Sequence, residues 1–415
     1  MFPHATLAIT PFRIAHSPQE IADLNTLLRL SPFGPETYEN GTARASNYGI
    51  DMHRMRSVRD AWLASDWHAT QDRLNTMPQY IARVPDHDPR TGKRTTMDVH
   101  FLAYPSDRHG TVPVLLLHGW PGMGCFELQP MVEHLRLHSK RPLDIIIPSL
   151  PGYLYSSPPP TDREYDFEDV ARLMHTFMLG LGYGAGYATQ GGDLGSFVAR
   201  VMACRYDQCK ISHFNFMQLK LGTPAIAATP LEDPTDKAHV ARWQKFQKTG
   251  MGYAMEHATR PATISFAVAS SPLALLAWLG EKLLDSFTDM PLPTLLQWLT
   301  LFWLTHSFST SIYMYRHLSA CGDFTVAPTA AERADPTCRM KGLKIVGKKM
   351  GYSTFPGEIF PVPKAWAAKT GDMVFYRLNE KGGHFAGCET PELLGKDFAE
   401  FVNMAWPADE EKSKL

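Results

Sequence analysis

The spacing of hydrophobic positions in this chain changes near residue 110. Before that point, apolar residues recur at helical spacing after Ser17, and Glu20 completes with it the Ser-x-x-Glu pattern of a capping box. Two more helices are predicted over residues 54–64 and 67–76, and residues 98–104 alternate as a strand does. We therefore predict that residues 1–105 form an N-terminal extension, mainly of helices and loops.

After residue 112, short and continuous apolar runs alternate with helical segments. The runs lie at residues 112–117, 144–148, 184–189, 211–216, 344–347 and 373–377. Strands that are apolar throughout are buried on both faces, which is typical of a parallel sheet covered by helices. The prediction is an α/β fold with a mostly parallel central sheet, built from residues 106–220 and 336–415.

This alternation stops between residues 221 and 335, where three helical segments are predicted instead, at 243–253, 264–284 and 294–315. Residues 262–280 contain no charged side chain, which approaches the length of a membrane span. Serines and a proline at 265 and 270–272 interrupt that stretch, and no basic cluster flanks it. We therefore predict a helical lid over a hydrophobic pocket, and no transmembrane anchor.

Composition and charge exclude several classes of function. The 415 residues are 44% hydrophobic and 20% charged, as in ordinary globular proteins, and the net charge of −1 gives no electrostatic basis for binding nucleic acid. The six cysteines lack metal-type spacing and are expected to be reduced thiols. No signal-peptide pattern is evident, so we expect a soluble, cytoplasmic protein. Because the cysteines lack metal-type spacing, we also expect no metal site.

The strongest chemical signal is Gly191-Gly192-Asp193-Leu194-Gly195, between a predicted strand and a predicted helix. Small residues on both sides permit a tight turn, and small-x-nucleophile-x-small is the nucleophile elbow, which usually carries serine. A carboxylate at that position is ionised near neutral pH and can attack carbon directly, forming an ester that water must then hydrolyse. The alternative is that Asp193 merely caps the following helix.

The loop His118-Gly119-Trp120-Pro121 ends a predicted strand. In proteins with this elbow, such a loop and the residue after the nucleophile supply backbone N–H groups to an oxyanion hole. The corresponding donors here are the N–H groups of Trp120 and Leu194, which would stabilise the tetrahedral intermediate of ester hydrolysis.

A histidine and a second carboxylate complete a triad in the order nucleophile, acid, histidine. His384 lies in the glycine turn Gly382-Gly383-His384-Phe385, late in the chain. Glu358 is the preferred acid. Asp372 is better interpreted as a turn residue before the next strand, and Glu380 is too close to the histidine loop.

Two tyrosines in the predicted lid can act as acids. A phenol can hydrogen-bond an epoxide oxygen and donate a proton as the ring opens. Tyr253 and Tyr315 are the candidates, although each could equally pack within an apolar helix. Spacing alone does not choose between Tyr313 and Tyr315.

Together these motifs resemble the microsomal-type epoxide hydrolase family, and its soluble fungal members in particular. The similarity extends over nearly the whole chain. The matching segments are Pro11-Phe12-Arg13-Ile14, Leu74-Asn75-Thr76-Met77-Pro78-Gln79-Tyr80, His118-Gly119-Trp120-Pro121-Gly122, Pro148-Ser149-Leu150-Pro151-Gly152-Tyr153, Gln190-Gly191-Gly192-Asp193, Tyr253-Ala254-Met255-Glu256-His257, Pro361-Val362-Pro363-Lys364-Ala365-Trp366 and Gly382-Gly383-His384-Phe385-Ala386.

The resemblance implies an α/β-hydrolase fold and a role for each candidate residue. Asp193 would be the nucleophile, His384 the general base and Glu358 its charge-relay acid, with Tyr253 and Tyr315 donating to the epoxide oxygen. It also implies a cis bond between Trp120 and Pro121, a hydrophobic epoxide substrate and no cofactor. The residues expected to line the substrate site are His118, Trp120, Pro121, Tyr253, Tyr315 and Phe385.

Two other functions stay open at this point. A haloalkane dehalogenase shares the Asp nucleophile, the histidine and the acid, but commonly has Trp after the nucleophile, where this chain has Leu194. A non-catalytic ligand-binding protein of the same fold is the second alternative. The sequence does not determine the natural epoxide, its role in detoxification or biosynthesis, the stereoselectivity, or whether the chain forms a homodimer.

Overall fold

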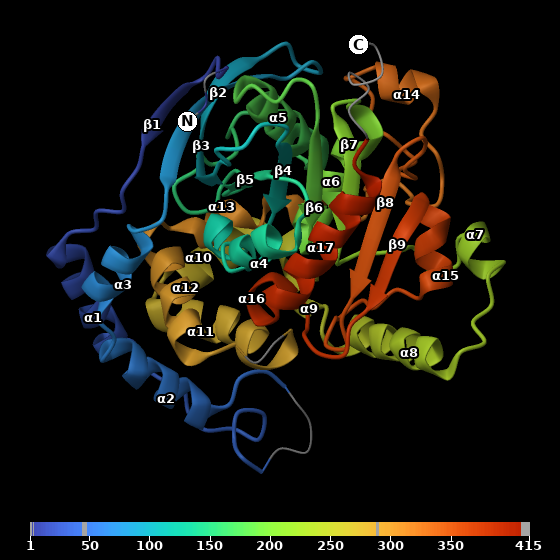
Figure 1. Ribbon diagram of the computed structural model, residues 1–415. Helices are drawn as coiled ribbons and strands as arrows, with labels where there is room; N and C mark the ends of the chain where they lie inside the picture. The colour runs from blue at the N-terminus through green and yellow to red at the C-terminus, as the bar shows by residue number, and fades with distance from the viewer. Residues whose placement is uncertain (1, 3, 44–47, 288–289, 408–415) are drawn as a thin grey trace.

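A single nine-stranded sheet runs through the molecule, in the order β1-β2-β3-β5-β4-β6-β7-β8-β9 (Figure 1). The computed structural model describes residues 2, 4–43, 48–287 and 290–407. The strands are β1 (Ala8–Pro11), β2 (Gln79–His87), β3 (Arg94–Tyr104), β4 (Val112–Leu117), β5 (Leu143–Pro148), β6 (Tyr187–Gly191), β7 (Cys209–Phe214), β8 (Lys349–Thr354) and β9 (Asp372–Leu378). β4 to β9 pair in parallel, which confirms the predicted α/β class.

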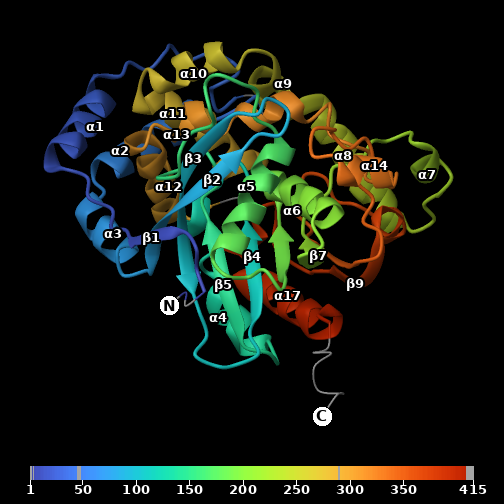
Figure 2. The same ribbon diagram turned by 90° about the horizontal axis from the view of Figure 1, so that it is seen from above.

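Helices cover both faces of the parallel part of the sheet. α4 (Met131–His138) and α17 (Pro391–Ala405) pack together on one face, and α5 (Phe167–Gly180) and α6 (Asp193–Arg205) on the other (Figure 2). The central strand β4, with the sequence VPVLLL, is buried along its whole length. Sandwiching between helices is the reason that this strand is apolar at every position instead of at alternate ones.

The N-terminal extension contributes three strands, two more than its sequence pattern predicts. β1, β2 and β3 pair antiparallel, and β3 joins the parallel part through an antiparallel pairing with β5. The predicted helices are present as α1 (Pro18–Leu30), α2 (Met52–Leu63) and α3 (Trp67–Leu74), and the capping box of Ser17 and Glu20 is confirmed. Pro85 and the polar residues around it hide β2 in the sequence, because proline is rare inside strands.

Most helices of residues 221–335 lie across one end of the sheet, whereas the last of them, α14 (Ala330–Ala334), lies near the opposite end, against α6 (Figure 1). They are α7 (Pro224–Ala227), α8 (Pro234–Thr249), α9 (Gly252–Thr259), α10 (Pro261–Ala269), α11 (Pro272–Glu281), the π-helix η2 (Lys282–Ser286), α12 (Leu292–Leu304), α13 (Ser307–Ser311), the 3-10 helix η3 (Tyr313–His317) and α14 (Ala330–Ala334). Ser271 caps α11 by accepting the N–H of Ala274 at 3.0 Å. This cap starts a new helix where the uncharged stretch is interrupted.

Within the described residues, no single helix has both the length and the apolar character needed to cross a membrane. The segments Pro261–Ala269 and Pro272–Leu284 reach that length and composition only as a pair, and a bend of 120° separates them.

The strand predicted at residues 344–347 is wrong. These residues form an irregular segment, in which Val346 is 52% exposed and Gly347 turns the chain with a φ of +75°. The strand is β8, which begins two residues later and contains the polar Ser353 and Thr354, both fully buried. Ser353 donates to the carboxylate of Asp397 at 2.7 Å, so a polar side chain is satisfied inside the core, which an apolar pattern does not reveal.

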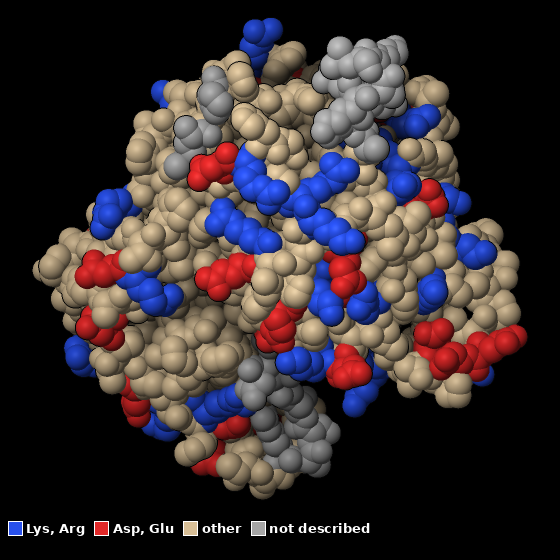
Figure 3. Space-filling view, viewed as in Figure 1, with Lys and Arg blue, Asp and Glu red and all other residues tan. Residues whose placement is uncertain are grey.

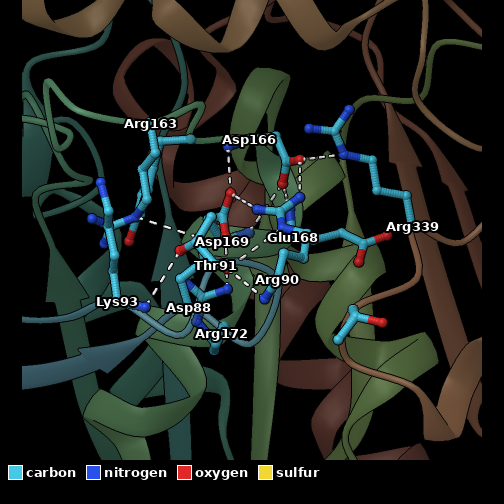
Figure 4. A network of polar contacts seen from close by, with 12 residues as sticks. Asp88, Arg90, Thr91, Lys93, Arg163, Asp166, Glu168, Asp169, Arg172 and Arg339 are labelled. Carbon is cyan, nitrogen blue, oxygen red and sulfur yellow. Dashed lines mark hydrogen bonds and ion pairs between the residues drawn. The ribbon is translucent and has the colours of Figure 1, made fainter.

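A network of ion pairs connects the turn of the β2–β3 hairpin to the start of helix α5 (Figure 4). Arg90, in the turn between β2 and β3, bonds both Asp166 and Asp169 at the start of α5. Arg339, which follows α14, reaches Asp166 from the other side at 2.7 Å. Away from this network, basic and acidic side chains are mixed across the face shown in Figure 3.

Candidate active site

Asp193 occupies a strained turn between β6 and α6. Its φ of +42° lies in the left-handed region, which a non-glycine residue rarely adopts. The turn is tight on both sides of the carboxylate: a Cβ added to Gly191 would lie 2.5 Å from the carbonyl oxygen of Gly195, and one added to Gly195 would lie 2.2 Å from that of Leu117. Glycine is therefore required at both positions, as a nucleophile elbow demands.

The two oxygens of the Asp193 carboxylate face different partners. Oδ1 accepts a hydrogen bond from the backbone N–H of Trp120 at 2.7 Å, and Oδ2 lies 3.2 Å from Nε2 of His384. Leu194 is the second residue of α6, so its N–H has no acceptor within the helix. The nucleophile candidate thus lies between the loop after β4, the start of a helix and an imidazole.

His384 is held between two carboxylates. Its Nδ1 lies 2.8 Å from Oε1 of Glu358, which also accepts the N–H groups of Ile359 at 2.6 Å and Phe360 at 3.2 Å. Burial by itself would lower the pKa of His384, but the charge of Glu358 and hydrogen bonds to Asp193 and Glu358 outweigh it. The pKa is therefore held well above its ordinary value, and the imidazole is a cation in the resting site.

Tyr253 of α9 and Tyr315 of η3 lie beside each other on the lid side of the site. Their ring centroids are 5.8 Å apart, and each contacts the ring of Trp120, at 5.5 Å and 5.7 Å. Burial raises the pKa of both phenols, and the charge of Asp193 raises it further. Both hydroxyls therefore stay protonated and able to donate.

Tyr313 lies in different surroundings from Tyr315. Its ring is 6.3 Å from that of Tyr165, and its pKa is raised by burial and then by the charges of Asp169 and Asp166, which belong to the ion-pair network. The structure thus separates two tyrosines that the sequence leaves equivalent, and it is Tyr315 that neighbours Asp193.

His118 and Pro121 shape the loop that carries Trp120. His118 is fully buried, with Nε2 accepting the N–H of Leu150 at 2.9 Å and Nδ1 lying 3.0 Å from the carbonyl oxygen of Gly119. Burial lowers the pKa of His118 to about 4, so the ring is neutral. Both nitrogens are engaged by backbone, so His118 holds the loop in place and leaves no ring nitrogen for a substrate.

The peptide bond between Trp120 and Pro121 is cis, as the resemblance implies. Phe385 is buried beside the catalytic candidates, with its ring 5.0 Å from that of His384, 6.2 Å from Phe287 and 5.5 Å from Trp298. These contacts place Phe385 in the apolar wall around the histidine.

The site contains residues that the sequence analysis did not single out. His257 packs edge-on against Trp120 at 4.5 Å and Tyr315 at 4.8 Å, and its Nε2 accepts the indole N–H of Trp278 at 3.0 Å. The ammonium of Lys282 lies 5.0 Å above the ring of Tyr253, and burial lowers the pKa of Lys282 to about 7. For His257, the sequence signal was its position four residues after Tyr253, which places both side chains on one face of a helix.

Two cavities reach the tyrosines. One of about 580 Å³ is lined by Tyr253 together with the apolar Phe246 and Ile359 and the charged Arg242 and Lys282. The other, of about 530 Å³, is lined by Tyr315 and mainly apolar residues, among them Leu219, Met251, Met255, Leu318 and Phe324. No group of His, Cys, Asp or Glu side chains in the described part of the chain could hold a metal ion.

Known epoxide hydrolases resemble this chain over nearly its whole length. Residues 9–125 match the family described as epoxide hydrolase N terminus, and residues 112–275 match the α/β hydrolase fold. The solved structure of Aspergillus niger epoxide hydrolase has 37% sequence identity and a TM-score of 0.84, covering 97% of this chain and 98% of its own. Epoxide hydrolase 1 of Sus scrofa is 25% identical over 96% of this chain and 89% of its own length.

The solved structure of juvenile hormone epoxide hydrolase from the silkworm Bombyx mori shares the fold. It has 24% identity and a TM-score of 0.80 and covers 96% of this chain and 95% of its own. The N-terminal match, the fold and the full-length similarity to the Aspergillus niger enzyme together show that this chain belongs to the microsomal-type epoxide hydrolases, within the α/β-hydrolase fold.

Proposed function

We propose that this epoxide hydrolase converts a hydrophobic epoxide and water to a vicinal diol through a covalent ester on Asp193. One observation carries the proposal: the Asp193 carboxylate lies between the N–H of Trp120 and the ring of His384, below the pair Tyr253 and Tyr315. This arrangement supports roles for Asp193 as nucleophile, His384 as base and the two tyrosines as acids in one site. None of these roles requires a metal or an organic cofactor.

The first step is opening of the epoxide ring. Tyr253 and Tyr315 bind the ring oxygen, and an Asp193 oxygen attacks one ring carbon from the opposite side. The carbon–oxygen bond of the ring breaks, and the released oxygen takes a proton from a tyrosine. The position of Asp193 at the start of α6 favours the ionised carboxylate that this attack needs.

The second step is hydrolysis of the ester. Alkylation removes the negative charge of Asp193, so the pKa of His384 falls; the proton that His384 gives up restores the tyrosine that protonated the product oxygen, and the imidazole becomes neutral. His384 then takes a proton from water, which attacks the carboxyl carbon of Asp193. The backbone N–H groups of Trp120 and Leu194 stabilise the oxyanion, and the diol leaves as the carboxylate is restored.

The walls of the site support a substrate with apolar substituents. The ring of Phe287 is 5.1 Å from that of His384 and 5.5 Å from that of Tyr253, and the ring of Phe385 is 5.0 Å from that of His384. We further propose that the enzyme acts in the cytoplasm, because its six cysteines are all free thiols.

A single-turnover reaction in ¹⁸O-labelled water tests the covalent route. Enzyme in excess over a styrene oxide-type epoxide is expected to incorporate the label into the Asp193 carboxylate, and the first diol formed is expected to be unlabelled. Label in that first diol would contradict the ester. The Asp193→Ala variant serves as the control and should form no diol.

The same preparation separates the alternatives. Release of chloride or bromide from haloalkanes would favour a dehalogenase, although aliphatic Leu194 offers no ring N–H to a halide. Epoxide binding without turnover would favour a ligand-binding protein.

A further inference from the structure

Glu127 lies behind the loop that carries the oxyanion donor. It follows the short 3-10 helix η1 (Gly124–Phe126), and its N–H bonds the carbonyl oxygen of Gly124 at 3.2 Å. The side chain folds back onto the loop, because a Cβ added to Gly122 would lie 1.7 Å from Oε2 of Glu127. A Cβ added to Gly119 would likewise lie 2.3 Å from Oδ1 of Asp193. Two glycines of one loop thus bring two carboxylates against it.

The carboxyl of Glu127 is buried and incompletely bonded. Glu127 is 6% exposed, and its Oε2 has no hydrogen-bond partner in the protein. Across the described residues, only one other carboxylate oxygen shares that condition, Oε2 of Glu358. Glu358 has its other oxygen bonded by His384 and two backbone N–H groups. Buried polar atoms are rarely left without a partner, so an oxygen like that of Glu127 indicates a bound species.

The charges that affect the pKa of Glu127 are those of Asp193 and His384, the proposed nucleophile and base. Burial and then the charge of Asp193 raise the pKa of Glu127, His384 and the N–H of Gly119 oppose them, and the net pKa is about 8. The charge of Glu127 in turn contributes to the raised pKa of Tyr153 and of Cys388, after burial. Glu127 is therefore in electrostatic reach of both nucleophile and base, yet the two steps proposed above do not use it.

We propose that Glu127 is a positioning residue for the hydrolytic water, an inference that rests on the covalent route proposed above. Its Oε2 accepts one O–H of the water, and the other O–H points to Nε2 of His384. His384 takes that proton while the water oxygen bonds the carboxyl carbon of Asp193. The tetrahedral adduct collapses with cleavage of the bond to the product oxygen, which receives the proton back from His384.

Ionisation of Glu127 becomes more favourable once the ester has formed, which is the stage at which the water must be bound. In the resting site, ionisation of Glu127 would place another negative charge near Asp193. Alkylation removes the charge of Asp193, and the later loss of the His384 proton removes a smaller, opposite effect, so the pKa of Glu127 falls and its carboxylate is favoured at the stage that needs the water. The alternative role, bracing the loop of Trp120, has no such dependence on the ester.

Rapid-quench single turnovers with a styrene oxide-type epoxide distinguish the two roles, because they resolve ester formation from ester hydrolysis. We expect Glu127→Gln, which keeps the shape of the side chain, to change ester formation by less than about twofold. Hydrolysis is expected to fall on the order of tenfold to a hundredfold, since a misplaced water loses much of its advantage. The ester should therefore accumulate. Glu127→Ala, if it folds, should likewise form the ester at a nearly normal rate and hydrolyse it slowly.

The pH dependence of hydrolysis provides a second readout. Wild-type hydrolysis should depend on two titrating groups, His384 as the base and Glu127 below pH 8, and Glu127→Gln should retain the first and lose the second. Asp397→Asn is the matched control. Asp397 is also a buried carboxyl whose pKa burial raises, but its partners are Ser353 and Asn379, outside the site. This variant should keep the wild-type profile.

Equal losses in both steps would show that Glu127 only braces the loop, and unchanged hydrolysis in Glu127→Gln would overturn the inference outright. Retention in Glu127→Gln of every titration seen in the wild type would also contradict it. If the wild type itself forms no ester, then the covalent route fails and this inference fails with it. Normal ester formation and hydrolysis in Glu127→Gln would leave the covalent route intact.

Discussion

The hydroxyl groups of two tyrosines only two positions apart, Tyr313 and Tyr315, are expected to differ in function. Tyr315 contacts Tyr253 and Trp120 beside the nucleophile, whereas Tyr313 lies near Tyr165 and the ion-pair network. We predict that Tyr315→Phe slows ester formation by about tenfold to a hundredfold, because one proton donor is lost. Tyr313→Phe should stay within about threefold of wild type. Stopped-flow kinetics of alkylation measure both, and equal impairment would contradict the assignment.

A second residue-scale prediction concerns the charge on His384. Glu358 stabilises the imidazolium, so Glu358→Gln should lower the pKa of His384, which NMR titration of the ring can follow. Hydrolysis should slow by about two to four orders of magnitude because the base loses its orientation, while ester formation persists. An unchanged imidazole titration would count against this role of Glu358.

The same pairing predicts how stability depends on pH. A folded-state pKa above the unfolded value means that the pairing stabilises the protein fully below about pH 6.5. That stabilisation is lost as the pH rises through the raised pKa. The difference in free energy of unfolding between wild type and Glu358→Gln should therefore be larger at pH 6 than at pH 9, as urea denaturation would show.

Some of the site was accessible from sequence and some was not. Asp193, His384 and Glu358 were identified because turn glycines and chain order mark them, and the structure brings all three together. Tyr313 and Tyr315 could not be separated, since a two-residue spacing does not define a direction inside a short 3-10 turn. Glu127 was not found, because an oxygen without a partner is a property of three-dimensional packing and has no local pattern.

At the scale of elements, the turn between β6 and α6 is the part most sensitive to added volume. A methyl group on Gly195 would meet the carbonyl oxygens of Leu117 and His118, at 2.2 Å and 2.6 Å. Backbone atoms at the end of β4 cannot move without displacing the neighbouring loop of Trp120. The elbow and the oxyanion loop therefore constrain each other.

We predict that Gly195→Ala destabilises the protein by about 1–3 kcal/mol, as overpacking does elsewhere, and also slows ester formation. Gly184→Ala is the matched control, since a Cβ there would meet nothing within 4 Å. It should change the free energy of unfolding by no more than about 0.5 kcal/mol. Denaturant unfolding gives both values, and a Gly195→Ala variant as stable as Gly184→Ala would refute the steric argument.

Element prediction succeeded where burial leaves one clear pattern. β4 was predicted at its observed bounds, since a strand buried on both faces is apolar throughout. β8 was misplaced because its buried Ser353 is satisfied by Asp397, far along the chain. β2 was missed because Pro85 and charged neighbours dominate its second half, although they pair with β3 in the sheet. In both strands, contacts with distant residues stabilise the strand although the local sequence pattern does not predict one.

At the scale of the whole molecule, the N-terminal extension is attached to both the sheet and the lid. Its strands continue the sheet, and the indole N–H of Trp62 donates to Thr300 of α12 at 2.8 Å, across 238 positions of sequence. The contacts of α1 and α2 with α11 add to this attachment. The lid that carries Tyr253 and Tyr315 is thus supported from outside as well as from the sheet.

The ion-pair network also connects the N-terminal extension to the rest of the molecule, and Arg90 pairs with two of its buried carboxylates. Asp166 and Asp169 are 3% and 1% exposed, and Arg90 bonds both of them. We predict that Arg90→Met destabilises the protein by about 1.5–3 kcal/mol, because each of the two buried carboxylates loses one cation and keeps another, Arg339 or Arg172. Lys93→Met is the matched control from the same turn. Its pair with Asp162 is exposed and screened by solvent, so this variant should unfold much as the wild type does.

The pH dependence of that loss has a definite sign. Burial opposes ionisation of Asp166, but Arg90 and Arg339 outweigh it and hold its pKa at about 2, below the ordinary value. The stability that comes from a depressed carboxyl pKa is present above about pH 3.9 and is lost as the pH falls through the folded value. Without Arg90 the pKa of Asp166 should rise, so the difference in free energy of unfolding between wild type and Arg90→Met should shrink as the pH falls from about 4 toward 2. Because Arg90→Met starts from a lower stability at neutral pH, its acid transition should lie at a higher pH than that of wild type or Lys93→Met. Coincident acid transitions for all three proteins, followed by circular dichroism, would show that the network does not fasten the extension to the core.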